Sequence, residues 1–321
     1  MAVDISDSDR KIWKSQFEDM IQRYKKFKLE YGREPNVIFV DRQKQAYVRL
    51  ARFKEMLERW EDFIKENGRK PGYIHILPQT ALKLACWLRY ADMQDFDPAI
   101  AVEKGCTDVF LSSKSLEHPN PTRDFILECN SQSIRVHAWI QCLYREGTFI
   151  SPNNKDNIAR VKKEISHAVD LGFDGVHLDY IRYPGIAPPD GHKIIQRLVY
   201  ELCKHTKGLE PKTRFSAAVM PEMDANARYY GQCYKCLAPY LDVQVVMAYK
   251  GNYNAHRSWI TNVTKYVIRE SWKPVWTGLQ TYRSDEDPTP LKRKELEADI
   301  RAAYQGGAQR AALFRFGLSN I

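Results

Sequence analysis

Several features that would narrow the class of this protein are missing from its 321 residues. The sequence has no run of about 18 apolar residues, so we predict that no segment spans a membrane. The polar segment Met1–Lys14 lacks the apolar core of a secretion signal, which leads us to expect a trimmed leader or release by cell lysis. Although the net charge is +9, no long basic run occurs, and a nucleic-acid partner is therefore not predicted.

The cysteines do not form the pattern of a disulfide framework. There are seven of them, an odd number, scattered along the chain. Cys86, Cys142 and Cys203 lie among apolar residues and are typical of small core side chains. Cys233 and Cys236 form one C-x-x-C pair, but a tetrahedral zinc site would need further ligands. We predict packing for this pair, with metal or redox work as the less favoured alternative, and we predict no metal and no cofactor.

A segment near the N-terminus occurs twice, at residues 17–41 and 53–77. Apolar residues recur at helical spacing in both copies: Phe17, Met20, Ile21, Tyr24 and Phe27, then Phe53, Met56, Leu57, Trp60 and Phe63. Gly32 and Gly68 follow at positions where a helix would end in a left-handed residue. Each copy is predicted to form a helix, a tight turn and a short extended segment. The two copies should pack together, because neither can bury its apolar stripe alone.

The two copies share the ending N-G-R-K-P-G-Y-I at Asn67–Ile74 and Y-G-R-E-P-N-V-I at Tyr31–Ile38. This duplicated pattern resembles the pseudomurein-binding repeat over residues 14–80. The resemblance implies attachment to the pseudomurein wall of methanogenic archaea, whose uronic carboxylates would suit a basic protein. The residues expected to contact the wall are Tyr24, Arg33, Pro35, Trp60, Arg69, Pro71 and Tyr73. The aromatic residues of the stripe are nevertheless favoured as core.

From residue 83 onward, strand-like runs alternate with amphipathic helical ones, as expected for parallel β/α units. The predicted strands are Lys83–Tyr90, Asp108–Ser113, Arg135–Leu143, Gly175–Ile181, Arg214–Met220, Asp242–Lys250, Pro274–Thr281 and Ala311–Gly317. Eight such units predict a (β/α)₈ barrel, in the α/β class. An open doubly wound sheet is the alternative, but no glycine-rich phosphate loop follows the first strand. We predict a mainly helical repeat domain at residues 1–80 and the barrel at residues 81–321.

Polar and aromatic residues gather at the predicted C-terminal ends of these strands, where the active sites of β/α barrels lie. Asp179 lies close to the C-terminal end of the fourth predicted strand, and Glu222 follows the fifth. Glycosidic cleavage needs two such carboxyl groups. Neighbouring strands lie ~5 Å apart, which suits the about 5.5 Å of a retaining pair, although loop geometry could open the separation to the about 6.5–9.5 Å of an inverting pair. The residues predicted to bind substrate around them are Arg89, His137, Trp139, Arg182, Tyr249, Lys250, Gln280 and Arg315.

The run Gly172–Pro184 reads G-F-D-G-V-H-L-D-Y-I-R-Y-P. Together with His137-Ala138-Trp139 and Met247-Ala248-Tyr249, it resembles a group of barrel glycoside hydrolases and hydrolase-like proteins over residues 80–321. The resemblance implies that Asp179 is the first catalytic carboxylate, whereas Glu222 rests on its place at a strand end. Family 18 chitinases carry D-G-x-D-x-D-x-E, and here Ile181 stands where that glutamate would be. Chitinase chemistry with a glutamic acid at that position is therefore not expected.

These features favour a glycoside hydrolase that cleaves the glycan of pseudomurein outside the cell, at the archaeal wall. Two alternatives remain open at this point. One is a catalytically silent barrel that only binds wall glycan. The other is a pseudomurein endoisopeptidase, for which Cys142 near His137 would be the candidate nucleophile and base.

Overall fold

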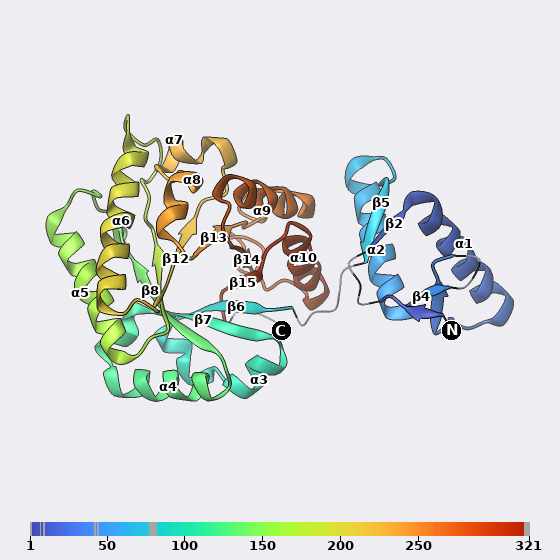
Figure 1. Cartoon of the computed structure of the whole chain (residues 1–321), viewed down its shortest axis with the longest axis horizontal. Helices are drawn as coiled ribbons and strands as arrows, with labels where there is room; N and C mark the ends of the chain where they lie inside the picture. The colour runs from blue at the N-terminus through green and yellow to red at the C-terminus, as the bar shows by residue number, and fades with distance from the viewer. Residues whose placement is uncertain are drawn as a thin grey trace. The chain divides into compact units, whose positions relative to one another are not determined.

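The computed structural model describes residues 2–6, 8, 10–41, 43, 45–76 and 82–317. The chain divides into two compact units, Met1–Leu82 and Lys83–Ile321 (Figure 1). Each unit has its own hydrophobic core. The predicted boundary, between residues 80 and 81, lies outside the described residues. In the part of the chain that the structure describes, no helix has the length and apolar character needed to cross a membrane.

The N-terminal unit contains the same strand–helix–strand segment twice. The first copy is β2 (Arg10–Trp13), α1 (Lys14–Tyr31) and β3 (Val37–Phe39), and the second is β4 (Ala46–Arg49), α2 (Leu50–Asn67) and β5 (Tyr73–Ile76). Both helices end as predicted at a glycine with positive φ, which is +63° at Gly32 and +64° at Gly68. The buried faces of the two helices meet in one core that includes Phe17, Met20, Phe53, Met56 and Trp60.

The strands of the two copies are exchanged. β2 pairs antiparallel with β5, placing Ile12 opposite Ile74, and β3 pairs antiparallel with β4, placing Ile38 opposite Val48. A short strand, β1 (Val3–Asp4), adds in parallel to β4. The unit is therefore α/β: its two 18-residue helices make up most of the regular structure, as predicted, and short strands join the two copies. Strands of three or four residues are too short to be stable alone, so each is held by the other copy.

The second unit confirms the predicted barrel. Eight parallel strands close in the order β11-β12-β13-β14-β15-β6-β7-β8. They are β6 (Leu84–Leu88), β7 (Cys106–Ser112), β8 (Arg135–Gln141), β11 (Gly175–Asp179), β12 (Arg214–Val219), β13 (Val243–Met247), β14 (Val275–Gln280) and β15 (Arg310–Phe314). Large rings fill the interior, among them Trp87, Phe110 and Trp276, so the barrel is a packed core and not a pore.

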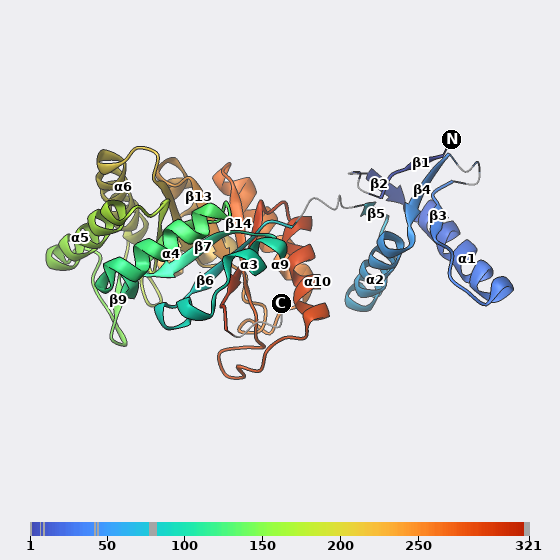
Figure 2. The same cartoon turned by 90° about the horizontal axis from the view of Figure 1, so that it is seen from below.

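Helices surround the strands, as Figures 1 and 2 show. They are α3 (Pro98–Glu103), α4 (Pro119–Ser131), α5 (Lys155–Leu171), α6 (Gly191–Leu209), α7 (Asn226–Tyr230), α8 (Tyr234–Leu237), α9 (Arg257–Ser271) and α10 (Arg293–Gln305). Short 3₁₀ segments, η1 (Tyr90–Asp95), η2 (Ser113–Glu117), η3 (Met223–Ala225) and η4 (Ala238–Tyr240), and a hairpin of β9 (Tyr144–Arg145) and β10 (Thr148–Phe149) complete the unit. Helical periodicity sets the inward faces: in α6, Ile195, Leu198, Val199 and Leu202 are buried.

Candidate active site

Asp179 is the last residue of β11, at the C-terminal end of the barrel, and only 8% of it is exposed. Trp139 of the neighbouring β8 donates from its indole Nε1 to Asp179 Oδ2 at 2.9 Å, and the backbone N–H of Tyr180 donates to Oδ1 at 2.7 Å. Burial raises the pKa of Asp179 above its usual range, against the lowering effect of these hydrogen bonds and of Arg182. The carboxyl group is thus desolvated and held in one orientation.

Glu222 lies three residues beyond Val219, the last residue of β12, and is half-buried. Tyr253 donates its hydroxyl hydrogen to Glu222 Oε1 at 2.5 Å. Burial raises the pKa of Glu222, while hydrogen bonds from Tyr253 and Tyr230 partly oppose this effect. A glutamate with a raised pKa keeps its proton at a higher pH than an exposed one, which suits it to act as a general acid.

Arg182 lies within electrostatic reach of both acids, since its positive charge lowers the pKa of Asp179 and of Glu222. Its guanidinium carbon lies over the rings of Phe149, Tyr230 and Tyr180, at 4.9, 5.1 and 5.2 Å from their centroids. The two acids therefore border the same part of the rim, next to a cation that aromatic rings hold in place.

The loop after β14 carries a third rim carboxylate, Asp285, which is not among the residues predicted from the sequence. Asn252 Nδ2 donates to Asp285 Oδ2 at 2.8 Å, and the hydroxyl of Tyr282 donates to Oδ1 at 2.8 Å. Burial raises the pKa of Tyr249, and the negative charges of Asp179 and Asp285 add to this effect. Because both carboxylates act on the same tyrosine, Asp285 lies near the same rim as Asp179. The sequence offers no sign that separates Asp285 from its neighbours Glu286 and Asp287, because all three lie outside any strand.

Exposed or partly exposed aromatic pairs line this rim as well. Tyr144 stacks on Tyr180 with ring centroids 4.6 Å apart, and Tyr90 stacks on His118 at 4.4 Å. Tyr249, predicted to bind substrate, stacks on Phe314 at 5.6 Å. Flat aromatic surfaces beside a few polar groups are typical of a ligand site that binds partly apolar rings.

Several residues predicted to bind substrate have other partners. His137 is fully buried, with Nε2 2.9 Å from Asp108 Oδ1. It shares a face of β8 with Trp139 but lies two residues nearer the N-terminal end of the strand. The structure therefore does not bring His137 to the rim. Lys250 turns to α10, where it pairs with Glu295 at 3.1 Å and with Asp299.

The remaining predicted residues stay near the rim. Arg89 pairs through two nitrogens with Asp92, at 2.6 and 2.7 Å. Gln280 donates to Asn252 Oδ1 at 3.0 Å and so supports the loop of Asp285. Arg315 follows β15, where its charge lowers the pKa of Tyr282 against the raising effect of burial. Trp139 contacts Asp179 directly, so its place is beside the acid.

The residues predicted to contact the wall also fall into two groups. Pro35, Pro71 and Trp60 are buried in the N-terminal core, and Tyr24 is half-buried with its hydroxyl 2.7 Å from Glu34. Arg33, Arg69 and Tyr73 are exposed: the guanidinium carbons of the two arginines lie 5.4 Å from the ring of Phe27 and 5.5 Å from that of Phe63. Of the aromatic residues expected to contact the wall, Tyr73 alone is exposed.

The C-x-x-C pair is a disulfide between Cys233 and Cys236, which corrects the prediction of simple packing. One helical turn brings their Cα atoms to 5.2 Å, within the range that a disulfide needs. Tyr234, between them, donates to the carbonyl of Met220 at 2.6 Å and so supports the chain just before Glu222. By contrast, Cys142 is buried, and burial raises the pKa of its thiol, which does not suit a nucleophile.

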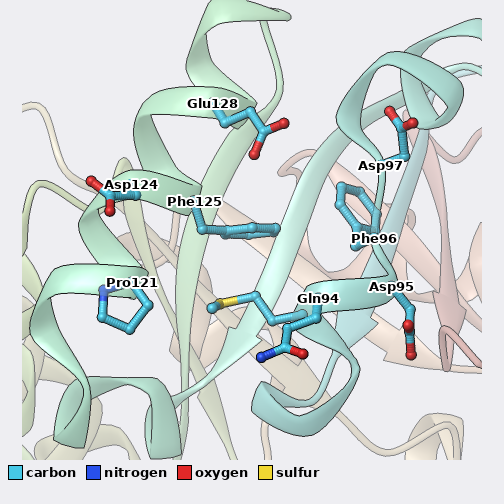
Figure 3. Close-up of a pocket in the computed structure, with 9 residues that line it drawn as sticks. Gln94, Asp95, Phe96, Asp97, Pro121, Asp124, Phe125 and Glu128 are labelled. Atoms are coloured by element: carbon cyan, nitrogen blue, oxygen red, sulfur yellow. The ribbon is translucent and has the colours of Figure 1, made fainter.

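A separate cavity of about 460 Å³ lies beside α4 (Figure 3). Its lining includes the buried side chains of Met93, Phe96 and Phe125, with exposed acidic residues around them. None of the rim residues named above lines it, so it is distinct from the site of Asp179.

Among the described residues, no group of three or more His, Cys, Asp or Glu is placed to hold a metal ion.

Comparison with known proteins gives a sequence match for the N-terminal unit and structural matches for the barrel. Residues 8–40 match the family described as the pseudomurein-binding repeat, and this range contains β2, α1 and β3 of the first copy. The second copy has the same elements at the same spacing. No curated protein sequence matches the chain.

Solved structures share the fold of the barrel. A class V chitinase from Pseudomonas fluorescens has a TM-score of 0.53 at 16% identity, over 74% of this chain and 96% of the chitinase. A β-galactosidase from Marinomonas has a TM-score of 0.57 at 8% identity, over 73% of this chain and 54% of that enzyme. The chain thus joins a pseudomurein-binding repeat to a barrel that resembles glycoside hydrolases in fold. At such identities, substrate and activity must be argued from the site.

Proposed function

We propose that this protein is a glycoside hydrolase that cleaves the glycan backbone of pseudomurein outside the cell, at the archaeal wall. The observation that carries the proposal is the pair of desolvated carboxyl groups, Asp179 and Glu222, within reach of one arginine at the catalytic end of a β/α barrel. The match of residues 8–40 to the pseudomurein-binding repeat supports pseudomurein as the polymer that is cleaved. Release of new reducing ends from purified pseudomurein sacculi is the direct assay.

The two carboxyl groups would divide the chemistry by their surroundings. Glu222, whose pKa is raised, would give its proton to the leaving glycosidic oxygen. Burial raises the pKa of Asp179 as well, but Asp179 accepts hydrogen bonds at both oxygens, which oppose this shift, and its ionised form would take a proton from the attacking water. Tyr249 and the stacked rings of Tyr144 and Tyr180 would contact the sugar and hold it beside the two carboxyl groups.

The endoisopeptidase alternative finds less support. It would need a Cys142 thiolate near a free histidine, whereas burial keeps the thiol protonated and His137 contacts Asp108. Release of free amines without reducing ends would be its signature. A barrel that only binds glycan would instead give binding to sacculi with no cleavage products.

We expect hydrolysis with inversion of the anomeric carbon. Leu178 pairs with Ala217, so Asp179 stands level with Ala218, four residues before Glu222. Because Glu222 lies three residues beyond the end of β12, its displacement past the strand end adds to the ~5 Å lateral spacing of neighbouring strands and favours the wider separation of about 6.5–9.5 Å, which leaves room for a water. Proton NMR during the first minutes of hydrolysis should show the product with inverted configuration. A retained first product would contradict the assignment and make Asp179 a nucleophile.

Glu222→Gln should lower the rate of reducing-end release by about 10²–10⁴-fold, because the amide cannot donate a proton. The wild-type rate should fall as pH rises through the pKa of Glu222, which burial raises, since only the protonated form is active. This alkaline fall should be absent in the variant. Rates measured across pH on sacculi test both points.

Asp285→Asn is the matched control, since Asp285 is a carboxylate at the same rim that we do not assign to proton transfer. Its rate should stay within about tenfold of wild type, with the alkaline fall preserved. If Asp285→Asn loses the alkaline fall and Glu222→Gln keeps it, the general acid is Asp285 and the assignment of Glu222 is wrong.

A further inference from the structure

The ribbon of β2 and β5 presents two large aromatic side chains to solvent. Trp13 is 58% exposed and Tyr73 is 42% exposed. The two residues are directly opposite in register, and their rings meet edge to face with centroids 5.9 Å apart. Ile12 and Ile74 point to the other face, into the core. Because an exposed tryptophan beside a tyrosine leaves apolar surface in water, such a pair indicates a binding surface.

Lys11 adds a positive charge to this surface. It lies two residues before Trp13 on the same face of β2, and its ammonium is 4.7 Å from the centroid of the Tyr73 ring. The cation is exposed and attached to a strand, so its position relative to the two rings is set by the ribbon. The surface therefore combines a flat apolar area with one fixed positive charge.

Both copies are needed to build this surface. Trp13 belongs to the first copy and Tyr73 to the second, and only the exchanged pairing of β2 with β5 places them side by side. On the other ribbon, the equivalent positions hold Arg49 and Val37, which also face each other. Arg49 pairs with Asp4 of β1 at 3.0 Å, so that ribbon has different chemistry. The pair of copies thus presents one such surface.

We propose that Trp13, Tyr73 and Lys11 form a composite carbohydrate-binding site for a carboxylated glycan. A pyranose ring would stack on the exposed indole, and Lys11 would contact its carboxylate. Charge complementarity supports this occupant, because an anionic sugar polymer suits both Lys11 and a chain of net charge +9. The inference rests on the proposed function in taking pseudomurein as the polymer, and it names where the wall is held.

The test is co-sedimentation of the full-length protein with pseudomurein sacculi. Trp13→Arg is the informative variant, since arginine occupies the equivalent position 49 of the same fold and should not disturb the ribbon. It should weaken binding at least about tenfold. Tyr47→Ala is the matched control on the other ribbon, where Tyr47 contacts Phe39 edge to face at 6.0 Å, and it should bind within about twofold of wild type.

Lys11→Gln gives a second measure, because loss of the cation should make binding to sacculi less sensitive to salt. Binding by Trp13→Arg equal to that of wild type would overturn the proposed site, as would an equal loss in Tyr47→Ala. Cleavage is read separately, as reducing ends released from soluble glycan fragments. Trp13→Arg should release them at the wild-type rate, so a failed binding site and a failed hydrolase assignment give different results.

Discussion

Asp179→Asn is expected to lower the release of reducing ends from pseudomurein sacculi on the order of 10³-fold or more. Asparagine has nearly the same shape, and its carbonyl oxygen can still accept from the indole of Trp139. It carries no negative charge, however, and cannot take a proton from water. Its amide group would also face the backbone N–H of Tyr180, a donor that now contacts Oδ1. The assay compares initial rates of the two proteins on the same sacculi.

Asp174→Asn is the matched control, because it makes the same chemical change just before the opposite end of the same strand. Asp174 accepts from the backbone N–H of Val136 at 2.8 Å, far along the strand from the rim. The Asp174→Asn variant should keep the wild-type rate of reducing-end release. Both Asp174→Asn and Asp179→Asn should sediment with sacculi as the wild type does. Equal release by Asp179→Asn and wild type would sink the hydrolase assignment of Asp179. Sedimentation without release by any protein would indicate a barrel that only binds.

The positions of the barrel strands could be predicted because such strands are buried on both faces and so form short apolar runs. β8 and β11 begin at Arg135 and Gly175, the predicted residues. The ends were less predictable: the fourth strand was expected to reach Ile181, but β11 stops at Asp179 because Tyr180 has a φ of +52°. That break in the extended backbone leaves Asp179 at the rim. It could not be predicted, because a positive φ is uncommon for a tyrosine.

The partners of charged side chains could not be predicted in the same way. Periodicity sets the face on which a side chain lies, but not the distant group that competes for it. Lys250 was expected at the end of the sixth strand and lies just after β13, but its side chain is bound by Asp299, 49 residues later in the chain. Likewise, the helical stripe indicated Trp60 correctly as a core residue, whereas the exposed Trp13 lies before residue 17, where the first copy was predicted to begin. Only the exchange of strands shows that Trp13 lies opposite Tyr73.

The largest stability effect is expected at the N-terminal end of the barrel, from Asp108→Ala. Asp108 is fully buried in β7. Three arginines surround it, each the first residue of its strand: Arg135 contacts it at 2.9 and 3.0 Å, Arg310 at 2.7 Å and Arg214 at 3.9 Å. One carboxylate thus links β7 to β8, β15 and β12. Alanine would leave these cations facing one another without their shared partner, which should destabilise the barrel by about 3–5 kcal/mol.

The pH dependence of this effect has a definite sign. Burial alone would raise the pKa of Asp108, but hydrogen bonds from His137 and Arg135 and the charge of Arg310 outweigh it and hold the pKa well below its usual range. A depressed pKa stabilises the fold above the unfolded value of about 4, and this contribution is lost as pH falls toward the folded value. The free-energy difference between wild type and Asp108→Ala should therefore be full at neutral pH and narrow below about pH 4.

Urea denaturation followed by tryptophan fluorescence at several pH values measures this difference. The exposed Asp170 of α5 offers a control, since Asp170→Ala also removes a carboxylate but should change the free energy of unfolding by less than about 0.5 kcal/mol. Equal stability of Asp108→Ala and wild type at neutral pH would show that the three arginines need no shared anion. If instead the difference persists unchanged into acid, the stabilisation comes from packing around β7 and not from the charge of Asp108, because only the ionised carboxylate can attract the arginines that begin β8, β12 and β15.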